Sequence, residues 1–554
     1  MRISKNLISV HILLVILLTF FLLVCIKAFP EKVNKTLLQK IERFKILAKE
    51  KADQGFDISL ALYLDTESKL AAKEGNFSLV HKLLDDAIKT LEDLPENFPL
   101  KRVIGLPVHA PKVIVTEGVP KYQTGQKVTE YKTAFRTKTV IAKEGMVKLE
   151  ITSTPIYVEE GTETQTLKGK IEDSPFGFHP GYTYKEKYID RKQINWITST
   201  SPKVFGFDYK ESLNIGVRWN RPEVYALWEI VQKSDAEIEE SVYNWEVTDY
   251  VYGTVPKDMN LLTNIDVTEN RLVREKDPWF QRTFRFKTKH LEEKYLVFVK
   301  KLVERYGSEG GNKRLHLQNS IRYWQVSNEP DQRTGDWEGY AHLLEITYKA
   351  VKESCPECKV VIGGLSSYPE GFYNFYMPIF KKMKGKNIDV FDFHVFGESW
   401  AWLAYKNRVE TIKRGLFENG YQNTEIWMTE TGTYSGKPKN LRNQTEKEQA
   451  EGLIKSYIYA MSLGVRKIFW AFGLIEGFID ADVDFDHMGL IYDGKGWDDP
   501  GHGTKKLSYY TYKMMTEKLE GSNFSRVETL NLGDRVYAFQ FNKKGRNVYV
   551  LWIQ

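Results

Sequence analysis

Two glutamates stand where apolar, strand-like runs of the sequence end. Glu329 closes the stretch Tyr-Trp-Gln-Val-Ser-Asn-Glu that begins at Tyr323, and Glu430 closes the run Ile-Trp-Met-Thr-Glu. A carboxylate at the end of a buried strand is placed for acid–base or nucleophilic chemistry, provided that a second carboxylate meets it. For Glu329 alone, the alternative is that Asn-Glu-Pro is only a turn, because Pro330 cannot continue a central strand. The choice depends on whether one fold brings the two glutamates together.

Alternating strands and helices between residues 173 and 521 predict such a fold. Eight β-prone runs are separated by segments of helical periodicity, which indicates an α/β fold with a parallel sheet. The runs are 176–179, 214–219, 260–265, 323–330, 359–364, 388–394, 425–430 and 467–472. They predict a (β/α)8 TIM barrel with insertions, in which the strand ends converge on one face. The fourth and seventh strands are nearly opposite, so Glu329 and Glu430 should face each other across the barrel mouth.

The barrel resembles clan A glycoside hydrolases in two motifs, which are Asn-Glu-Pro at 328–330, at the end of the fourth strand, and the glutamate that ends the seventh strand. It is most similar to family 39 and its uncharacterised relatives. The resemblance extends from residue 174 to about 521, including the stretches 488–491 and 508–513, and does not cover the first 100 residues. It implies a retaining glycosidase with Glu329 as acid and base and Glu430 as nucleophile, their carboxyl groups roughly 5 to 5.5 Å apart.

The resemblance also implies partners for the two glutamates. The acid should be kept protonated by a partly apolar site, and the nucleophile should be kept ionised by hydrogen bonds and a nearby cation. Arg218, at the end of the second predicted strand, is the candidate for that cation, with a surface ion pair as the alternative. Asn328 is expected to hydrogen-bond the sugar 2-hydroxyl. His394, ending the sixth strand, should contact the nucleophile or the sugar, although a lone histidine there is as often structural.

Three further residues at strand ends are candidate sugar contacts. Trp470, ending the eighth strand, is expected to form a stacking floor, because the C–H face of a sugar packs on an indole. His179 and Trp219, which end the first and second predicted strands, are expected to contact the sugar as well. Trp324, inside the fourth strand, is assigned to the barrel core. No metal and no cofactor are expected.

The segments that flank the barrel predict smaller modules. Residues 31–98 carry apolar residues at helical spacing and should form an antiparallel helical hairpin or a three-helix unit. Residues 99–172 and 522–554 carry short β-prone runs, and we expect both to join in one antiparallel accessory β domain. Cys355 and Cys358, before the fifth strand, should form a local disulfide or remain two free thiols, on the face opposite the catalytic mouth.

The N-terminal segment 1–30 combines Arg2 and Lys5 with an apolar run from Ile12 to Ile26 that only Thr19 interrupts. This pattern predicts an uncleaved membrane anchor or a cleaved signal peptide, and in both cases the remainder is exported to the cell surface or beyond. The 79 basic and 73 acidic residues give a net charge of +6 without dense blocks of Lys and Arg. Nucleic-acid binding is therefore not expected.

These features together predict a retaining glycoside hydrolase that cleaves β-linked poly- or oligosaccharides with two glutamates. The alternative from another class is a non-catalytic carbohydrate-binding or cell-surface scaffold with a glycosidase-like barrel. A third possibility is an enzyme that trims a nascent chain within a polysaccharide synthesis or export system at the membrane. Both carboxylates and their candidate partners are present, which favours a hydrolase.

Overall fold

The computed structural model describes most of the chain from residue 31 onward. The described ranges are 31–53, 76–92, 135–141, 147–153, 171–184, 207–267, 283–307, 320–477, 482–494 and 501–553, with residue 534 excepted and a few shorter pieces between them. Residues 101–168 form a compact unit separate from the rest of the chain. The predicted signal or anchor at 1–30 lies outside the described residues. Within those that are described, no helix combines the length and the apolar character needed to cross a membrane.

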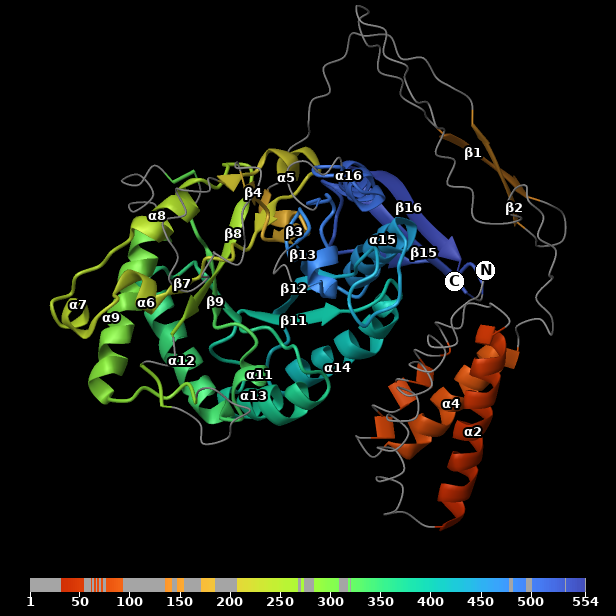
Figure 1. Ribbon diagram of the computed structural model, residues 1–554, viewed down its shortest axis with the longest axis horizontal. Helices are drawn as coiled ribbons and strands as arrows, with labels where there is room; N and C mark the ends of the chain where they lie inside the picture. Colours follow the sequence, from red (N-terminus) through yellow and green to blue (C-terminus); the bar gives the residue numbers. More distant parts are fainter. Residues whose placement is uncertain are drawn as a thin grey trace, which may run out of the picture. The chain divides into compact units, whose positions relative to one another are not determined.

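Nine parallel strands form the central sheet, and eight of them close into a barrel (Figure 1). They are β3 Phe176–His179, β6 Trp219–Asn220, β8 Asn260–Asp266, β9 Tyr323–Val326, β10 Lys359–Ile362, β11 Val390–Phe396, β12 Glu425–Gly432 and β13 Val465–Ala471, with the short β7 Ala226–Leu227 beside β8. The hydrogen-bonded order is β6-β3-β13-β12-β11-β10-β9-β8, and the pairing of β6 with β8 closes the ring. The predicted (β/α)8 barrel is confirmed.

Amphipathic helices surround the strands (Figure 1). The longer ones are α8 Glu246–Gly253, α9 Lys289–Tyr306, α12 Trp337–Ser354, α13 Met377–Met383, α14 Tyr405–Glu418, α15 Glu446–Ser462 and α16 Leu507–Leu519. In α9 the buried residues Tyr295, Phe298, Val299 and Leu302 recur at spacings of three and four, so one face of the helix packs inward. The side chain of Thr288 caps the first turn of this helix by accepting from a backbone N–H.

Shorter elements connect these units. They are the helices α5 Lys210–Asn214, α6 Trp228–Val231, α7 Asp235–Glu239 and α11 Pro330–Arg333, the single turns η1 Ile171–Asp173, η4 Phe372–Tyr376, η5 Ala401–Ala404 and η6 Asp484–His487, and the strand pair β4 Thr183–Tyr184 and β5 Phe207–Asp208. Several of them follow the carboxyl ends of barrel strands. Those connections build the walls of the mouth.

The barrel interior is layered. Near the start of the strands, an apolar plug gathers Trp219, Leu262, Tyr323, Val361, Val390, Trp427 and Phe469. Because side chains alternate along a strand, residues two positions further along also point inward. On three of the strands these are Arg221, Gln325 and Asp392, all fully buried. A buried polar layer therefore lies between the apolar plug and the mouth.

The C-terminal strands pack on the barrel. An antiparallel sheet is formed by β14 Glu528–Thr529, β15 Val536–Lys543 and β16 Arg546–Ile553. Tyr537 and Trp552 from this sheet both meet the ring of Trp402, just before α14, edge-on. In the other segment, β1 Phe135–Ile141 pairs with β2 Val147–Ser153. That both segments join in one accessory domain stays a prediction, because alternation marks a strand without identifying its partner.

Two helices, α2 Glu31–Asp53 and α4 Phe77–Glu92, lie in the region predicted as a helical module. Leu37 of α2 and Val80 of α4 are buried in one apolar cluster. In the barrel, Cys355 and Cys358 form a disulfide between α12 and β10. Of the two predicted alternatives, a local disulfide or two free thiols, the structure has the disulfide. It lies at the amino-terminal end of β10, away from the mouth.

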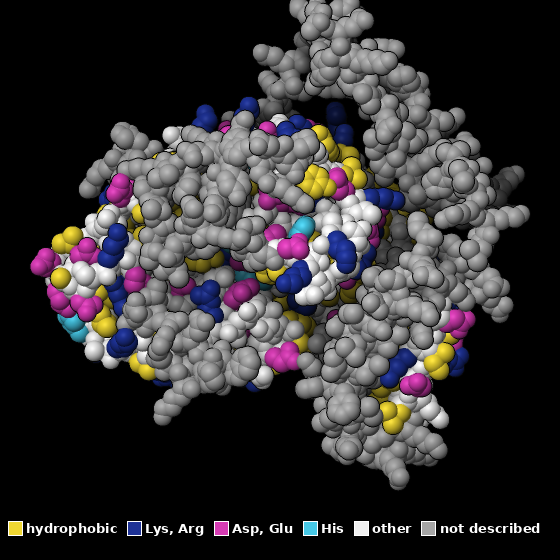
Figure 2. Space-filling model, in the orientation of Figure 1, with side chains coloured by type: hydrophobic (Ala, Val, Ile, Leu, Met, Phe, Trp, Pro, Cys, Tyr) yellow, Lys and Arg dark blue, Asp and Glu magenta, His cyan; other side chains and the backbone are white. Residues whose placement is uncertain are grey.

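Charges of both signs are interspersed on the described surface. On the face shown in Figure 2, Lys and Arg side chains lie among Asp and Glu side chains and do not gather into one block. Some form ion pairs, such as Arg305 with Asp249 and Lys300 with Glu353, both at 2.6 Å. Mixed charge of this kind is typical of a solvated surface.

Candidate active site

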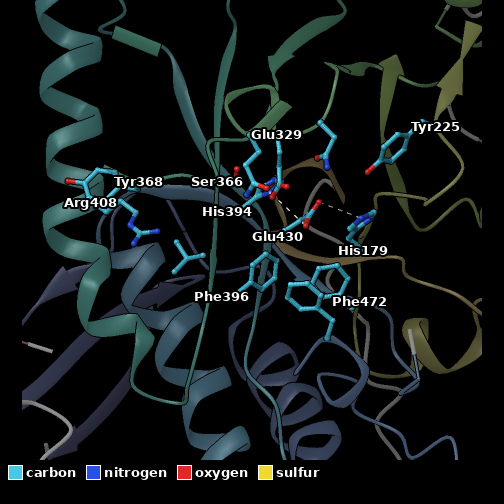
Figure 3. A pocket seen from close by; sticks show the side chains of 14 residues that line it. His179, Tyr225, Glu329, Ser366, Tyr368, His394, Phe396, Arg408, Glu430 and Phe472 are labelled. Atoms are coloured by element: carbon cyan, nitrogen blue, oxygen red, sulfur yellow. Dashed lines mark hydrogen bonds and ion pairs between the residues drawn. The ribbon is translucent and has the colours of Figure 1, made fainter. Parts of the chain in front are cut away.

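A pocket opens among the carboxyl ends of the barrel strands, with both candidate glutamates in its wall (Figure 3). Its volume of about 680 Å³ is typical of ligand-binding pockets. Its lining includes His179, Tyr225, Asn328, Glu329, Ser366, Tyr368, His394, Phe396, Arg408, Glu430 and Phe472. These residues stand at or after the ends of barrel strands, which is the face where such barrels bind ligands.

Glu329 is oriented by an irregular turn. The strand β9 ends at Val326, and Ser327 and Glu329 then adopt left-handed backbone conformations, with φ of 63° and 44°. Such conformations cost a non-glycine residue about 1 to 3 kcal/mol and are concentrated at functional sites. The strand ends before Pro330, which instead begins helix α11. A proline fits this position because the first N–H groups of a helix have no hydrogen-bond partner within the helix. The turn leaves the Glu329 side chain 21% exposed in the pocket wall.

Glu430 reaches the same pocket because of a β-bulge. Between β11 and β12, Asp392 is aligned with Trp427 and His394 with Glu430, so β12 holds an extra residue over this interval. Trp427 and Glu430 are three positions apart, and regular alternation would place them on opposite faces of the sheet. With the bulge, Trp427 lies in the apolar plug while Glu430 faces the pocket, 4% exposed.

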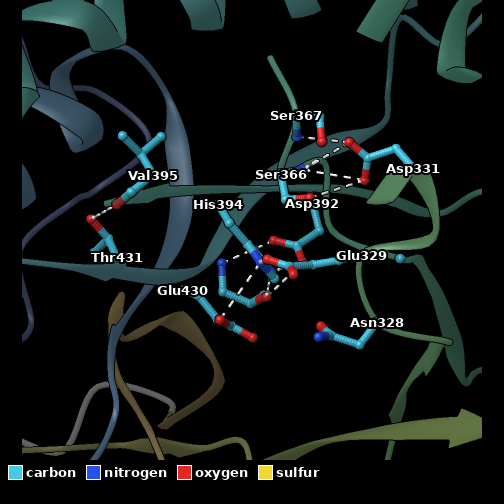
Figure 4. A network of polar contacts seen from close by, with 12 residues as sticks. Asn328, Glu329, Asp331, Ser366, Ser367, Asp392, His394, Val395, Glu430 and Thr431 are labelled. Atoms are coloured by element: carbon cyan, nitrogen blue, oxygen red, sulfur yellow. Dashed lines mark hydrogen bonds and ion pairs between the residues drawn. The ribbon is translucent and has the colours of Figure 1, made fainter. Parts of the chain in front are cut away.

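The two carboxylates lie close together (Figure 4). One oxygen of Glu329, one of Glu430 and a ring nitrogen of His394 all lie within 4.8 Å of one another. His394 Nδ1 is 2.8 Å from Glu329 Oε1 and 3.7 Å from Glu430 Oε2. This spacing is near the roughly 5 to 5.5 Å of retaining glycosidases and shorter than the roughly 6.5 to 9.5 Å of inverting ones.

The cation beside Glu430 is Arg221, and the prediction of Arg218 was wrong. Arg221 is fully buried, and its Nη1 and Nη2 donate to Glu430 Oε1 and Asn328 Oδ1, both at 2.6 Å. The second strand begins at Trp219, later than expected, because the end of helix α5 and the turn that follows it occupy residues 214–216 of the predicted run. Arg218 therefore precedes the strand at the opposite end of the barrel, where its charge acts on Glu520.

If the protein is the hydrolase that the sequence predicts, replacing Arg221 with Met should lower kcat/KM for a cleaved glycoside by about 10²- to 10³-fold, because the charged donor to Glu430 is lost. Arg218→Met is the matched control, with the same change of side chain three positions away, and it should leave kcat/KM nearly unchanged. Initial rates on one aryl β-glycoside measure both variants, and circular dichroism checks that each is folded. Equal losses in the two variants would contradict this role of Arg221.

His394 is a positively charged link between the two glutamates. Burial alone would lower its pKa, but the charges of Glu430 and Asp392 outweigh burial and raise the pKa well above its ordinary value. Burial acts to raise the pKa of Glu329, but the hydrogen bond and charge of His394 outweigh it, and that pKa is lowered. The expectation that an apolar site keeps the acid protonated is therefore wrong for the free pocket. The raised pKa of His394 and the lowered pKa of Glu329 favour the proton on His394, one 2.8 Å hydrogen bond from Glu329.

Behind His394 lies the buried polar layer, which sequence reasoning missed; Figure 4 shows its member Asp392 beside His394. Asp392 Oδ2 is 3.2 Å from His394 Nε2 and accepts from Gln325 Nε2 at 2.6 Å and from Thr429 Oγ1 at 2.5 Å. Gln325 Oε1 accepts in turn from Arg221 Nε at 3.0 Å. One continuous chain of hydrogen bonds thus joins the two cations that flank the glutamates.

Asn328 and His179 both lie in the pocket, next to Glu430. Because Asn328 Oδ1 accepts from Arg221, its Nδ2 is the group oriented to donate to a sugar hydroxyl. His179 Nδ1 donates to the backbone oxygen of Arg221 at 2.7 Å, so Nε2 is an acceptor, 3.6 Å from Glu430 Oε1. Burial, together with the charge of Arg221, lowers the pKa of His179 to about 3, so this ring is neutral and forms no ion pair. The sugar-binding roles of both residues stay predictions.

Trp470 and Trp219 do not line the pocket, contrary to prediction. Phe469 belongs to the apolar plug, so the next residue, Trp470, points away from the barrel interior and is fully buried there. Trp219 lies within the plug itself, below the polar layer. Both predictions were wrong because a tryptophan near the end of a strand faces the pocket only if its position in the alternation points it there. Trp324 is buried, as expected for the core.

Three phenylalanines provide the aromatic surface that the tryptophans do not. Phe396, Phe472 and Phe485 line the pocket. Their ring centroids are 5.1 Å apart for Phe396 and Phe472, 5.4 Å for Phe396 and Phe485, and 4.2 Å for Phe472 and Phe485. Phe472 comes directly after β13, the eighth barrel strand along the chain, and its side chain lines the pocket where Trp470 does not.

Glu329, His394 and Glu430 also have donor atoms close enough together to hold a metal ion. Each carboxylate already has a cationic partner, which is Arg221 for Glu430 and the protonated His394 for Glu329. A divalent ion would have to displace these partners and bind beside a positively charged ring. The donor set therefore fits acid–base and nucleophilic chemistry better than metal binding.

No protein-family model and no curated protein sequence matches this chain. Among solved structures, it is similar to a family 39 glycoside hydrolase from the gut symbiont Bacteroides cellulosilyticus WH2, with a TM-score of 0.49, 16% identity, and 77% of this chain and 78% of that chain covered. A glucosidase from Croceicoccus marinus has a TM-score of 0.44, 14% identity and coverages of 67% and 77%. AbfB, a family 51 α-L-arabinofuranosidase from Bifidobacterium longum, has a TM-score of 0.41 and 13% identity, with 67% of this chain and 79% of that chain covered. With TM-scores below 0.5 and identities of 13% to 16%, these similarities carry no argument about what this chain does.

Proposed function

We propose that this protein is a retaining glycoside hydrolase that cleaves β-linked poly- or oligosaccharides. The observation that supports this best is the pair Glu329 and Glu430, with carboxylate oxygens within 4.8 Å of each other in one pocket. The two glutamates have different cations, Arg221 for Glu430 and His394 for Glu329. An arginine keeps its proton, whereas a histidine can release one. This difference suits a nucleophile that stays ionised and an acid that must gain and lose a proton.

The proposed reaction has two steps. In the first, Glu430 attacks the anomeric carbon, the bond to the leaving oxygen breaks, and Glu329 gives that oxygen a proton received from His394. In the second, Glu329 takes a proton from a water whose oxygen attacks the same carbon, and the bond to Glu430 breaks. The proton then returns to His394, so one water is consumed for each bond cleaved.

Product stereochemistry tests the proposal. Proton NMR during hydrolysis of an aryl β-glycoside should show the β-anomer of the released sugar first, followed by mutarotation. A 2-deoxy-2-fluoro glycoside with a good leaving group should label Glu430, which peptide mass spectrometry detects. An α-anomer formed first, or a label elsewhere, would contradict the retaining mechanism. Glycan binding without cleavage of any aryl glycoside or polysaccharide would favour the non-catalytic scaffold.

We further propose that the protein is exported and held at the cell surface by its N-terminal apolar segment. The disulfide between Cys355 and Cys358 supports export, because disulfides persist in oxidising compartments. Fractionation of cells after a carbonate wash checks this, and recovery of the chain in the cytoplasm would contradict it.

A further inference from the structure

The pocket continues on both sides of the glutamate pair (Figure 3). His179 lies to one side of Glu329 and Glu430, and Tyr368 and Arg408 lie to the other. The His179 side belongs to the nucleophile, because the ring nitrogen is 3.6 Å from the Glu430 carboxylate. A sugar whose anomeric carbon meets Glu430 occupies that side. The leaving group must then extend past the acid, toward Tyr368 and Arg408.

Arg408 and Tyr368 form a preassembled surface at this leaving-group end. Arg408 lies in the first turn of α14, and its guanidinium carbon is 4.7 Å from the centre of the Tyr368 ring, which follows β10. Stacking on an aromatic face sets the plane of a guanidinium. A guanidinium held by its face presents its N–H groups edge-on, in the geometry that binds the oxygens of a carboxylate or sulfate in pairs.

Arg408 also adds positive charge at one end of the pocket. Among the described residues that line the pocket, Arg408 is the only lysine or arginine. Its charge lies on the side away from His179, where it can attract an anionic group of a substrate without displacing the partners of the glutamates.

We propose that Arg408 and Tyr368 form a leaving-group subsite for a sugar that carries an anionic group, either a uronate carboxylate or a sulfate ester. The substrate is then an acidic glycan, cleaved at the bond that joins a β-linked sugar to the acidic residue. This inference rests on the proposed hydrolase function and adds the chemistry of the leaving sugar. An Arg408 that only braced Tyr368 would not affect which glycans are cut.

Matched pairs of substrates test the subsite. One pair is a β-linked oligosaccharide whose leaving sugar is a uronate, together with its carboxyl-reduced form. The other pair is a sulfated oligosaccharide and its desulfated form. For one of the pairs, the wild-type kcat/KM should be about 10- to 100-fold higher for the acidic member, and that pair identifies the anion. Arg408→Gln should bring the ratio of acidic to neutral cleavage close to one.

Arg414→Gln is the matched control, because it makes the same change at an exposed position of the same helix and should keep the ratio. Equal wild-type cleavage of acidic and neutral members, or equal loss on both members in Arg408→Gln, would overturn the proposal. An aryl β-glycoside with a neutral leaving group distinguishes failure of the subsite from failure of the hydrolase function. If it is cleaved and no acidic preference is found, only the subsite is refuted. If no substrate is cleaved, the hydrolase function is refuted as well.

Discussion

Glu430→Ala is expected to lower kcat by about 10⁴-fold or more, because no other group can form the covalent bond to the anomeric carbon. Glu430 reaches the pocket through the bulge in β12 and is held there by Arg221. Removing its carboxylate leaves space beside the guanidinium where a small anion can enter. Azide should therefore restore turnover of an aryl β-glycoside and yield a glycosyl azide of inverted configuration, which NMR identifies.

Glu425→Ala provides the control for this variant. Glu425 begins the same strand β12 at its exposed end, far from the pocket, and its replacement should leave turnover intact. Normal turnover by Glu430→Ala, or an azide product of retained configuration from it, would contradict the assignment of the nucleophile.

Glu329→Ala is expected to have an effect that depends on the leaving group. A sugar leaving group needs a proton, so cleavage of an oligosaccharide should fall by about 10²- to 10⁴-fold. An aryl leaving group of low pKa needs none, so the first step should survive and the covalent intermediate on Glu430 should accumulate. A pre-steady-state burst of the released phenol measures this. Added azide should now give a glycosyl azide of retained configuration, opposite to the product of Glu430→Ala.

The pH profile gives Glu329 a second readout. His394 and Glu329 hold one proton between them, because the pKa of His394 is raised well above 6.5 and that of Glu329 is lowered. As pH rises, the pair loses this proton only at the raised pKa of His394. The basic limb of the wild-type kcat/KM profile should therefore lie above pH 6.5, and Glu329→Ala should abolish it. A basic limb that persists unchanged in Glu329→Ala would contradict the role of Glu329 as the acid.

The barrel and both glutamates could be predicted because local patterns carry that information. Eight β-prone runs between helical segments indicate a parallel sheet, and the closed ring of eight strands confirms it. Glu329 and Glu430 were identified because each follows an apolar run, and barrel geometry places strand ends on one face. Asn328, His179 and His394 follow from the same rule, and all three lie in the pocket.

Residues that depend on the exact start and phase of a strand could not be predicted in the same way. The sequence predicts Arg218 in place of Arg221 because the end of helix α5 and the turn after it occupy residues 214–216, which have β-prone character. Trp470 was chosen in place of Phe472 because a large aromatic residue near a strand end looks like a sugar platform whichever way it points. A signal for the buried polar layer was present, since Gln325 and Asp392 each follow an inward apolar residue by two positions.

Local patterns in the sequence are enough to predict the fold class and the two carboxylates, because hydrophobic periodicity and strand ends are local properties. The tertiary structure decided which cation serves each glutamate, which aromatic rings line the pocket and where the proton rests. Those features depend on the start of β6, the alternation along β13 and the bulge between β11 and β12. A shift of one residue in a strand exchanges its inward and outward side chains, and only the packed barrel sets that register.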